Sequence, residues 1–396
     1  MNCEAEYKSI YGKDPESIAF CPYRIAPLGA HIDHQLGAIN GFAIDKGIHI
    51  AYGTKESGIC EIRSLNIPKR AQFHVREIPP EKAGDWADHC RAAARMLGEK
   101  YILRYGVSAV IEGELPIGGL SSSASVIIAF MSALAAVNGI KLEPWETISF
   151  AKAAENRYVG VNCGKLDQSC EVLCRKDQLL YLDCKDDSYR LIPWSGKDFV
   201  FAIFFSGLDR SLANSDYNLR QDECKAAAYN LLAYAGLPYG KFSDAVLRNV
   251  PPEVYEEHKS KLPENFRKRA EHFFTEYDRV LKGMECWTKG DIESYGQLVF
   301  ESGRSSIENY ECGCPELIRL YEIMTETPGI YGGRFSGAGF KGCCMALVDP
   351  GRADEVLQHV KKEYLDSFPD LAERYVGAIC HSADGVDLNS NVGVRL

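Results

Sequence analysis

The apolar and polar positions along the chain predict strands in its first half and helices in its second. Short apolar or alternating runs predict strands over 43–53, 108–114, 179–184 and 199–205. A longer apolar stretch over 123–137 predicts a buried helix that ends at Asn138 and Gly139, and Pro144 opens another helix that runs to about residue 158. The longest apolar run, 124–137, holds about 14 residues, which is too few to cross a bilayer.

The second half shows helical periodicity. Apolar residues recur at intervals of three and four over 218–235, 263–288, 291–302, 315–325 and 352–368. Two apolar runs, 343–348 and 377–381, interrupt these helices and predict strands. A chain of 396 residues is long enough for two domains. We therefore predict an α+β protein with an N-terminal domain over 1–192 and a C-terminal domain over 193–396.

The charge of the chain limits its partners. The formal net charge is −10, which argues against non-specific binding to nucleic acid because such binding needs a basic surface. An acidic protein that binds an anionic ligand must gather positive charge locally. The first 14 residues lack the apolar core of a signal peptide.

The chain holds 15 cysteines. None forms a C-x-x-C pair, and Cys312 with Cys314, like Cys343 with Cys344, lies too close for a zinc site. Without a secretory signal, these cysteines indicate small buried residues in a reducing compartment. We expect a cytoplasmic protein with neither nucleic acid nor a membrane among its partners.

The stretch 115–125 carries the strongest chemical signal. A predicted strand ends near Leu115, Gly118 and Gly119 follow, and a run of hydroxyl side chains then opens the apolar helix. Backbone N–H groups in such a turn form an anion-binding nest, which the helix dipole strengthens. A serine-rich helix cap is the simplest alternative, and the Walker A pattern is absent. The stretch predicts a phosphate-binding loop.

A second polar cluster lies at 22–34, in a proline- and glycine-rich stretch that we expect to form a loop between strands. It contains Arg24, His31, Asp33 and His34. A metal site made from the last three is a weak alternative, because ligands so close in sequence rarely converge. A polar surface loop is the other alternative.

Two further segments carry carboxylates or glycines. In 154–168, Glu155 lies late in a helix and Asp167 follows a Cys-Gly turn, so one carboxylate could serve Mg²⁺ and the other a substrate hydroxyl. Ordinary positions on a helix are the alternative for both. In 332–344, small residues surround Ser336 and Phe340 before an apolar strand begins. That pattern is typical of a ligand-supporting loop or of a tight turn.

These four segments, in this order, resemble the galactokinase branch of the GHMP kinases (galactokinase, homoserine, mevalonate and phosphomevalonate kinases). Further matches lie at 86–89, 215–220 and 314–317 and at Cys224. The resemblance implies a ribosomal-protein-S5-like N-terminal domain, a GHMP C-terminal domain and an active site in the cleft between them. It also implies ATP and Mg²⁺ as cofactors, a sugar or sugar acid as the small-molecule partner, and a monomer.

The resemblance assigns roles to the matching positions. Arg24 and Asp167 match the catalytic pair, in which the carboxylate accepts or orients the proton of the anomeric hydroxyl and the guanidinium steadies the carboxylate and the phosphoryl group. Ser123 and Glu155 match the Mg²⁺ ligands, and Trp86 matches an aromatic residue that contacts adenine. The substrate-binding positions are Ala30, His31, Asp33, Gly164 and Tyr217. The positions around the ATP phosphates are Gly118, Gly119, Ser121, Ser122, Ser123, Ala124 and Ser125.

The sequence departs from galactokinases in three places. The phosphate loop is one residue shorter, and Ala338 and Lys341 stand where galactokinases usually have Gly. Ala30 replaces a Glu that in galactokinases contacts the outer hydroxyls of the sugar, including the one on C6, and Ile32 and His34 replace Thr and Tyr. Two like charges about 4 Å apart repel by roughly 1 kcal/mol in water and by about 4 kcal/mol at an effective dielectric constant near 20. Ala30 therefore removes a repulsion that a carboxylate on C6 would meet.

The runs 22–34, 305–313 and 334–340 look like those of the galacturonokinases within this branch. We therefore expect phosphorylation of D-galacturonic acid on O1, which gives α-D-galacturonate 1-phosphate. An ordinary galactokinase, a relaxed hexose kinase and a sugar sensor without catalysis are the alternatives, although such sensors lose residues of the serine-rich loop that this chain keeps. A cation must face the sugar carboxylate, and the candidates are His34, Arg210 and Lys341.

Overall fold

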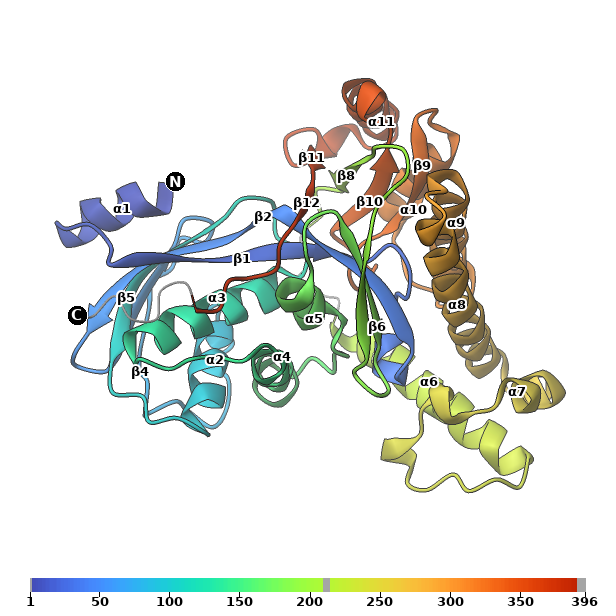
Figure 1. The fold of residues 1–396 in the computed structure, drawn as a ribbon, viewed down its shortest axis with the longest axis horizontal. Coiled ribbons are helices and arrows are strands. Elements are labelled where there is room, and N and C mark those ends of the chain that lie inside the picture. Colours follow the sequence, from blue (N-terminus) through green and yellow to red (C-terminus); the bar gives the residue numbers. More distant parts are fainter. Residues whose placement is uncertain (1, 209–213, 390–396) are drawn as a thin grey trace.

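The computed structural model describes residues 2–208 and 214–389. Within these residues the chain forms two units, each made of a β-sheet and the helices that cover it (Figure 1). The larger sheet has eight strands and lies in the N-terminal unit, whereas the smaller sheet has four strands and lies in the C-terminal unit. The α+β architecture predicted from the sequence is confirmed.

The larger sheet is built around one long strand. β2 (Ala38–Lys55) pairs antiparallel with β1 (Ser17–Ile25), β5 (Gly106–Gly113) and β6 (Gln178–Asp183), and its middle part pairs with both β1 and β5. β3 (Ile59–Ser64) runs parallel to β5, and β4 (Ala71–His74) and β7 (Tyr189–Pro193) form the two edges. A bulge in β1 between Pro22 and Arg24 interrupts the pairing with β2, as expected where a proline cannot donate a ladder hydrogen bond.

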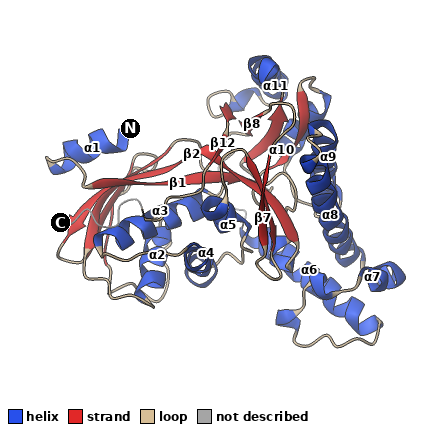
Figure 2. Cartoon of the chain, in the orientation of Figure 1, coloured by secondary structure: helices blue, strands red, loops and turns tan. Residues whose placement is uncertain are grey.

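Helices cover both faces of this sheet (Figure 2). One face carries α2 (Asp88–Gly98), α3 (Ser122–Val137), α4 (Pro144–Ala153) and α5 (Leu166–Leu173). The other face carries α1 (Asn2–Tyr11), whose Tyr7 hydroxyl lies 2.7 Å from Ser108 Oγ. Most of α3 is buried, because an apolar helix without a polar face needs cover on all sides.

The C-terminal unit is an antiparallel sheet packed against long helices. Its strands lie in the order β11 (Val376–Cys380), β8 (Val200–Phe205), β10 (Cys343–Val348) and β9 (Ile330–Phe335). α9 (Ile292–Glu308) and α10 (Pro315–Glu326) pack on β9, while α8 (Glu264–Thr288) packs between α9 and α6 (Asn214–Tyr234). α7 (Pro252–His258) and α11 (Ala353–Ser367) complete the unit.

The end of the described chain returns to the first unit. β12 (Ser382–Ala383) pairs with β2, although residue 382 lies in the segment that we assigned to the C-terminal domain. β12 has only two residues and thus no periodicity from which it could be predicted.

The strands change from the larger sheet to the smaller one between β7 and β8. The domain bounds 1–192 and 193–396 stay a prediction.

Two other expectations need correction. We expected a loop at 22–34, yet residues 22–25 belong to β1. The helix predicted from Pro144 to about residue 158 changes at Ala154 into a π-helical turn, Ala154–Val159, which carries Glu155. Such turns are frequent at functional sites.

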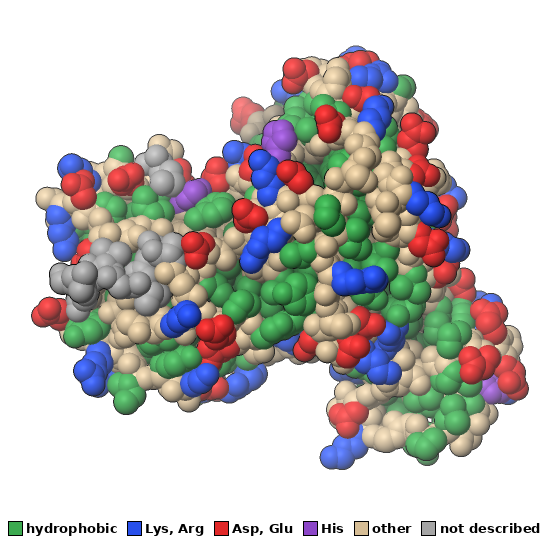
Figure 3. Space-filling view, in the orientation of Figure 1, with side chains coloured by type: hydrophobic (Ala, Val, Ile, Leu, Met, Phe, Trp, Pro, Cys, Tyr) green, Lys and Arg blue, Asp and Glu red, His purple; other side chains and the backbone are tan. Residues whose placement is uncertain are grey.

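The charged surface residues and the buried cysteines are arranged as the composition of the chain led us to expect. Acidic and basic side chains of the described residues are interspersed on the face shown in Figure 3. All 15 cysteines are free, and most are buried. None of the described helices combines the length and the apolar character that a membrane span requires.

Candidate active site

One cavity brings all four sequence segments together. Residues of the N-terminal unit form most of its wall, and Tyr217 and the segment 335–341 close it from the C-terminal unit. It is lined by Arg24, Ala26, Ala30, His31, Asp33, Gly119, Ser121, Ser123, Glu155, Val161, Cys163, Gly164, Leu166, Asp167, Tyr217, Phe335, Gly337, Ala338, Phe340 and Lys341.

The segment 118–121 forms a tight turn at the start of α3. Gly118 and Gly119 have φ values of 136° and 89°, and Ser121 has a φ of 58°. Because Ser121 and Ser123 line the cavity, α3 begins at its wall, and the positive end of the helix dipole lies there. The buried hydroxyl of Ser121 has no hydrogen-bond partner among the described residues. This end of the cavity suits an anion.

The second glycine-rich segment supports that turn. A Cβ atom at Gly119 would lie 2.5 Å from Cys343 Sγ, and one at Gly118 would lie 3.1 Å from the Cα of Gly342. The carbonyl of Gly119 also accepts a hydrogen bond of 2.7 Å from Ser336 Oγ. The two segments are rich in glycine because their backbones lie in direct contact.

Arg24 and Asp167 form an ion pair at the cavity wall. Arg24 Nε donates to Asp167 Oδ1 at 2.7 Å, and Arg24 Nη1 donates to the carbonyl of Gly119 at 2.9 Å. The Arg24 side chain is 4% exposed, whereas that of Asp167 is 26% exposed. A buried guanidinium at the end of β1 thus holds a carboxylate of α5 that stays open to the cavity.

Ser123 and Glu155 present a second set of oxygen atoms. Ser123 Oγ donates to Glu155 Oε1 at 2.8 Å, and Gln168 Nε2 donates to Glu155 Oε2 at 2.5 Å. Mg²⁺ prefers such oxygen ligands and keeps several waters, so a hydroxyl and a carboxylate that line one cavity fit this ion. The described residues contain no group of three or more His, Cys, Asp and Glu side chains that could hold a metal ion. The alternative metal site at 31–34 is therefore wrong.

The cavity wall also contains the positions predicted to bind the sugar. Asp33 accepts a hydrogen bond from the backbone N–H of Leu166 at 3.2 Å, and burial, followed by the nearby Asp167, raises its pKa. The His31 ring stacks on Tyr310 with 4.1 Å between centroids. His31 and Asp33 are both buried, so this segment is not a polar surface loop.

Gly164 lies in contact with Asp33. A Cβ atom at Gly164 would lie only 2.0 Å from Asp33 Oδ2 and 2.8 Å from the backbone nitrogen of His34. Gly164→Ala must therefore displace Asp33, and we expect kcat/KM to fall by about tenfold or more, because small misplacements at a reacting centre are costly. Steady-state kinetics of the variant test this expectation. Gly98→Ala is the control, since its Cβ would meet nothing within 4 Å; equal activities of the two variants would contradict the assignment.

Comparison with known proteins places this chain in a family. The description "GHMP kinases N terminal domain" matches residues 88–175, "GHMP kinases C terminal" matches 284–366, and "Galactokinase galactose-binding signature" matches 5–54. The galacturonokinase of Arabidopsis thaliana is 39% identical over 393 residues, which cover 93% of this chain and 92% of that protein. The chain belongs to the GHMP kinases. It is thus an enzyme that uses ATP as its phosphoryl donor.

Further relatives agree with this family. A galactokinase of Clostridium perfringens is 32% identical, with 93% of this chain and 95% of that protein covered. The crystal structure of Lactococcus lactis galactokinase complexed with galactose has a TM-score of 0.87 at 25% identity, covering 97% of this chain and 98% of that one. A Methanococcus jannaschii mevalonate kinase shares the fold, with a TM-score of 0.64 at 17% identity and coverage of 93% and 98%.

Some predicted positions of this kinase lie outside the cavity lining. Ala124 and Ser125 are fully buried, and Ser125 Oγ donates to Glu171 Oε1 at 2.7 Å instead of facing a ligand. The indole N–H of Trp86 donates to the carbonyl of Lys69 at 3.1 Å. The other predicted positions that are not among the lining residues are Gly118 and Ser122.

The three candidate cations differ in position. Lys341 lines the cavity, next to the Gly342 that contacts Gly118. His34 is not among the lining residues; its Nε2 lies 3.2 Å from the Tyr310 hydroxyl, and burial lowers its pKa to about 3, so the ring is neutral. Arg210 lies outside the described residues.

Two residues of α8 contact the loop at Gly29 and Ala30, which carries positions predicted to bind the sugar, and the sequence analysis missed both. Glu276 Oε1 accepts a hydrogen bond from the backbone N–H of Gly29 at 2.7 Å, and His272 Nε2 lies 3.0 Å from the carbonyl oxygen of Ala30. The sequence could have indicated these contacts, because polar residues recur at helical spacing on the buried face of α8. These residues are Arg269, His272, Glu276 and Arg279.

Proposed function

We propose that this kinase transfers the γ-phosphoryl group of ATP to O1 of D-galacturonic acid and releases α-D-galacturonate 1-phosphate and ADP. Ala30 carries the proposal. It lines the cavity beside His31 and Asp33, and it is small and uncharged at the position where galactokinases have a Glu. The similarity to the Arabidopsis thaliana galacturonokinase supports the same substrate.

The ion pair gives the acceptor hydroxyl its reactivity. Asp167, which is open to the cavity, would take the proton of the anomeric hydroxyl as O1 attacks the γ-phosphorus and the bond to the ADP oxygen breaks. Arg24 holds that carboxylate through Nε, and its positive charge also stabilises the negative charge that develops on the phosphoryl group. Asp33 and Gly164 would fix the sugar ring, since phosphoryl transfer depends mainly on positioning and charge neutralisation.

The turn at the start of α3 would hold the phosphates of ATP. Its backbone N–H groups and the unpartnered hydroxyl of Ser121 suit phosphate oxygens. Ser123 and Glu155 would hold Mg²⁺, which neutralises part of the phosphate charge when it is bound. We also propose that the kinase acts as a monomer in the cytoplasm.

Glu155→Ala should increase the requirement for Mg²⁺. The substitution removes the carboxylate that faces Ser123, so the Mg²⁺ concentration for half-maximal activity is expected to rise by about tenfold or more. A titration of activity against Mg²⁺ at fixed ATP measures this shift. Glu355→Ala, which removes a surface carboxylate paired with Arg352, is the control. An unchanged titration in Glu155→Ala would mean that Glu155 is no ligand.

Phosphorylation of galactose is the second candidate activity. It is favoured by the match of residues 5–54 to the galactokinase galactose-binding signature. The similarity to Lactococcus lactis galactokinase in complex with galactose also favours it. Turnover of ATP with galacturonate, glucuronate and galactose as separate acceptors distinguishes the two. ATP turnover that depends on sugar would also exclude a sensor without catalysis.

A further inference from the structure

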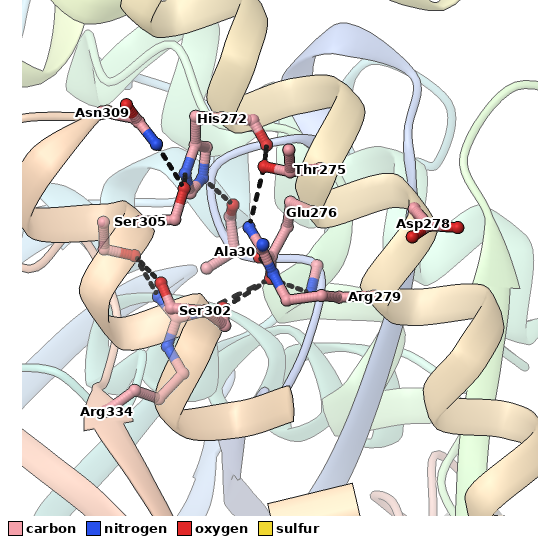
Figure 4. A network of polar contacts seen from close by, with 12 residues as sticks. Ala30, His272, Thr275, Glu276, Asp278, Arg279, Ser302, Ser305, Asn309 and Arg334 are labelled. Atoms are coloured by element: carbon pink, nitrogen blue, oxygen red, sulfur yellow. Dashed lines mark hydrogen bonds and ion pairs between the residues drawn. The ribbon is translucent and has the colours of Figure 1, made fainter. Parts of the chain in front are cut away.

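A buried group of charged residues lies directly behind the loop that carries Ala30 (Figure 4). Glu276 and Arg279 extend from α8 and Arg334 from β9; we call these three residues the charge cluster. Glu276 and Arg334 have fully buried side chains, and that of Arg279 is 10% exposed. The guanidinium of Arg334 also donates to Ser302 and Ser306 in α9 and to the carbonyl of Phe335.

The charge cluster holds more positive than negative charge. Arg279 Nε lies 2.8 Å from Glu276 Oε2, and Arg334 Nη1 lies 3.5 Å from Glu276 Oε1. Among the described residues, neither guanidinium has another carboxylate within 4 Å. Burial lowers the pKa of the adjacent His272 to about 4, so that ring is neutral. Two guanidinium groups therefore share one carboxylate.

Glu276 remains ionised in this surrounding. Burial alone would raise its pKa, but Arg279 and Arg334 outweigh that effect and hold the pKa at about 2. An ionised Glu276 balances one of the two guanidinium groups and leaves the other without a counter-charge. An uncompensated charge in the interior is unfavourable, and a nearby anion relieves the cost.

The backbone at Gly29 and Ala30 lies between the charge cluster and the cavity. Glu276 binds the N–H of Gly29, and His272 contacts the carbonyl of Ala30. On the other side of this backbone, Ala30 and His31 line the cavity. Burial is the main cause that lowers the pKa of His31 well below its ordinary value, and the positive charge of Arg334 lowers it further. The field of the cluster thus reaches the cavity wall.

We propose that the charge cluster makes the cavity wall at Ala30 selective for an anionic group on the substrate. Arg279 and Arg334 are then specificity-determining residues that act through their field and without touching the sugar. A carboxylate at this wall supplies the missing negative charge, whereas a hydroxyl does not. The inference rests on the proposed function, since the anion is the carboxylate of the sugar acid. The charge cluster would also provide the local positive charge that a chain with a net charge of −10 needs to bind an anionic sugar.

Arg279→Gln is the most informative variant. It removes one positive charge at the partly exposed edge of the cluster and keeps the pair of Glu276 with Arg334. We expect kcat/KM for galacturonate to fall by about tenfold, since an uncompensated unit charge acts on a carboxylate that it does not touch. The value for galactose should remain almost unchanged, and Arg279→Lys, which keeps the charge, should retain the preference.

Lys282→Gln is the matched control. Lys282 lies three residues further along α8, pairs with Asp278 and is 61% exposed, so the variant changes the net charge equally without touching the cluster. We expect the ratio of kcat/KM for galacturonate to that for galactose to remain at the wild-type value. An equal loss of the ratio in both variants would show an effect of net charge and would overturn the proposal.

Lys341→Met tests the competing source of positive charge. Lys341 lies beside the phosphate loop, so we expect its removal to affect both sugars alike. If Lys341→Met lowers the ratio and Arg279→Gln does not, Lys341 faces the carboxylate and the charge cluster has no such role. If Arg279→Gln lowers both sugars equally, the cluster is only structural and the proposal fails. Wild-type enzyme that does not accept galacturonate would instead refute the proposed function.

Discussion

Replacing Asp167 by Asn is expected to lower kcat by about 10²–10⁴-fold, the range typical of a lost general base. The amide keeps the size of the carboxylate and can still accept the hydrogen bond that Arg24 Nε now donates at 2.7 Å, but it cannot take a proton from O1. Because the side chain of Asp167 is 26% exposed, the fold and the binding of ATP should be nearly intact.

Three measurements on this variant separate chemistry from structure. Steady-state kinetics give kcat, a thermal melt reports the fold, and calorimetric titration gives the affinity for ATP. Asp187→Asn, which removes a carboxylate paired with Lys165 at the protein surface, is a control that should turn over at close to the wild-type rate. Near-wild-type turnover by Asp167→Asn would show that this residue is not the base.

Ala30→Glu is expected to harm the use of galacturonate far more than the use of galactose. The new carboxylate would extend into the cavity and meet the charged substituent of galacturonate, whereas galactose brings a hydroxyl. A repulsion of about 1–4 kcal/mol corresponds to roughly 5- to 1,000-fold in the ratio of kcat/KM values. The new carboxylate would also neutralise the charge cluster, so both effects act in the same direction.

Ala30→Gln separates charge from size. Its side chain is as long as that of Glu and fills the same space, and added bulk in a packed site has a cost of its own. We expect Gln to lower kcat/KM for both sugars to a similar extent and Glu to change their ratio, because specificity is a difference between transition-state free energies. If Glu and Gln lower both sugars equally, position 30 does not distinguish the sugars by charge.

The sequence predicted those features that depend on residues near one another along the chain, such as helices and turns. The apolar stretch of α3 and the glycines before it predicted a buried helix that begins after a glycine-rich turn, as the structure shows. The run of hydroxyl groups could not show which of them face a ligand. Residues two apart on a helix point in different directions, so Ser123 lines the cavity while Ser125 is buried against Glu171. Ser121, which also lines the cavity, precedes the helix.

Contacts between distant segments could not be predicted in this way. The backbone contact of Gly118 with Gly342 explains why both segments need glycine, but it depends on how the two units pack. The same holds for Glu276 and His272, which hold the loop at Ala30 from the other unit. The spacing of Glu276 and His272 along α8 is that of any partly polar helix. Only the structure shows which residues they contact.

The most direct test of this account is the comparison of kcat/KM for galacturonate, glucuronate and galactose with wild-type enzyme, ATP and Mg²⁺. We expect galacturonate to be preferred over galactose by about tenfold or more, since an uncharged Ala30 and a positive charge cluster behind it favour a carboxylate at C6. A strong preference for galactose would contradict this account and identify the enzyme as a galactokinase.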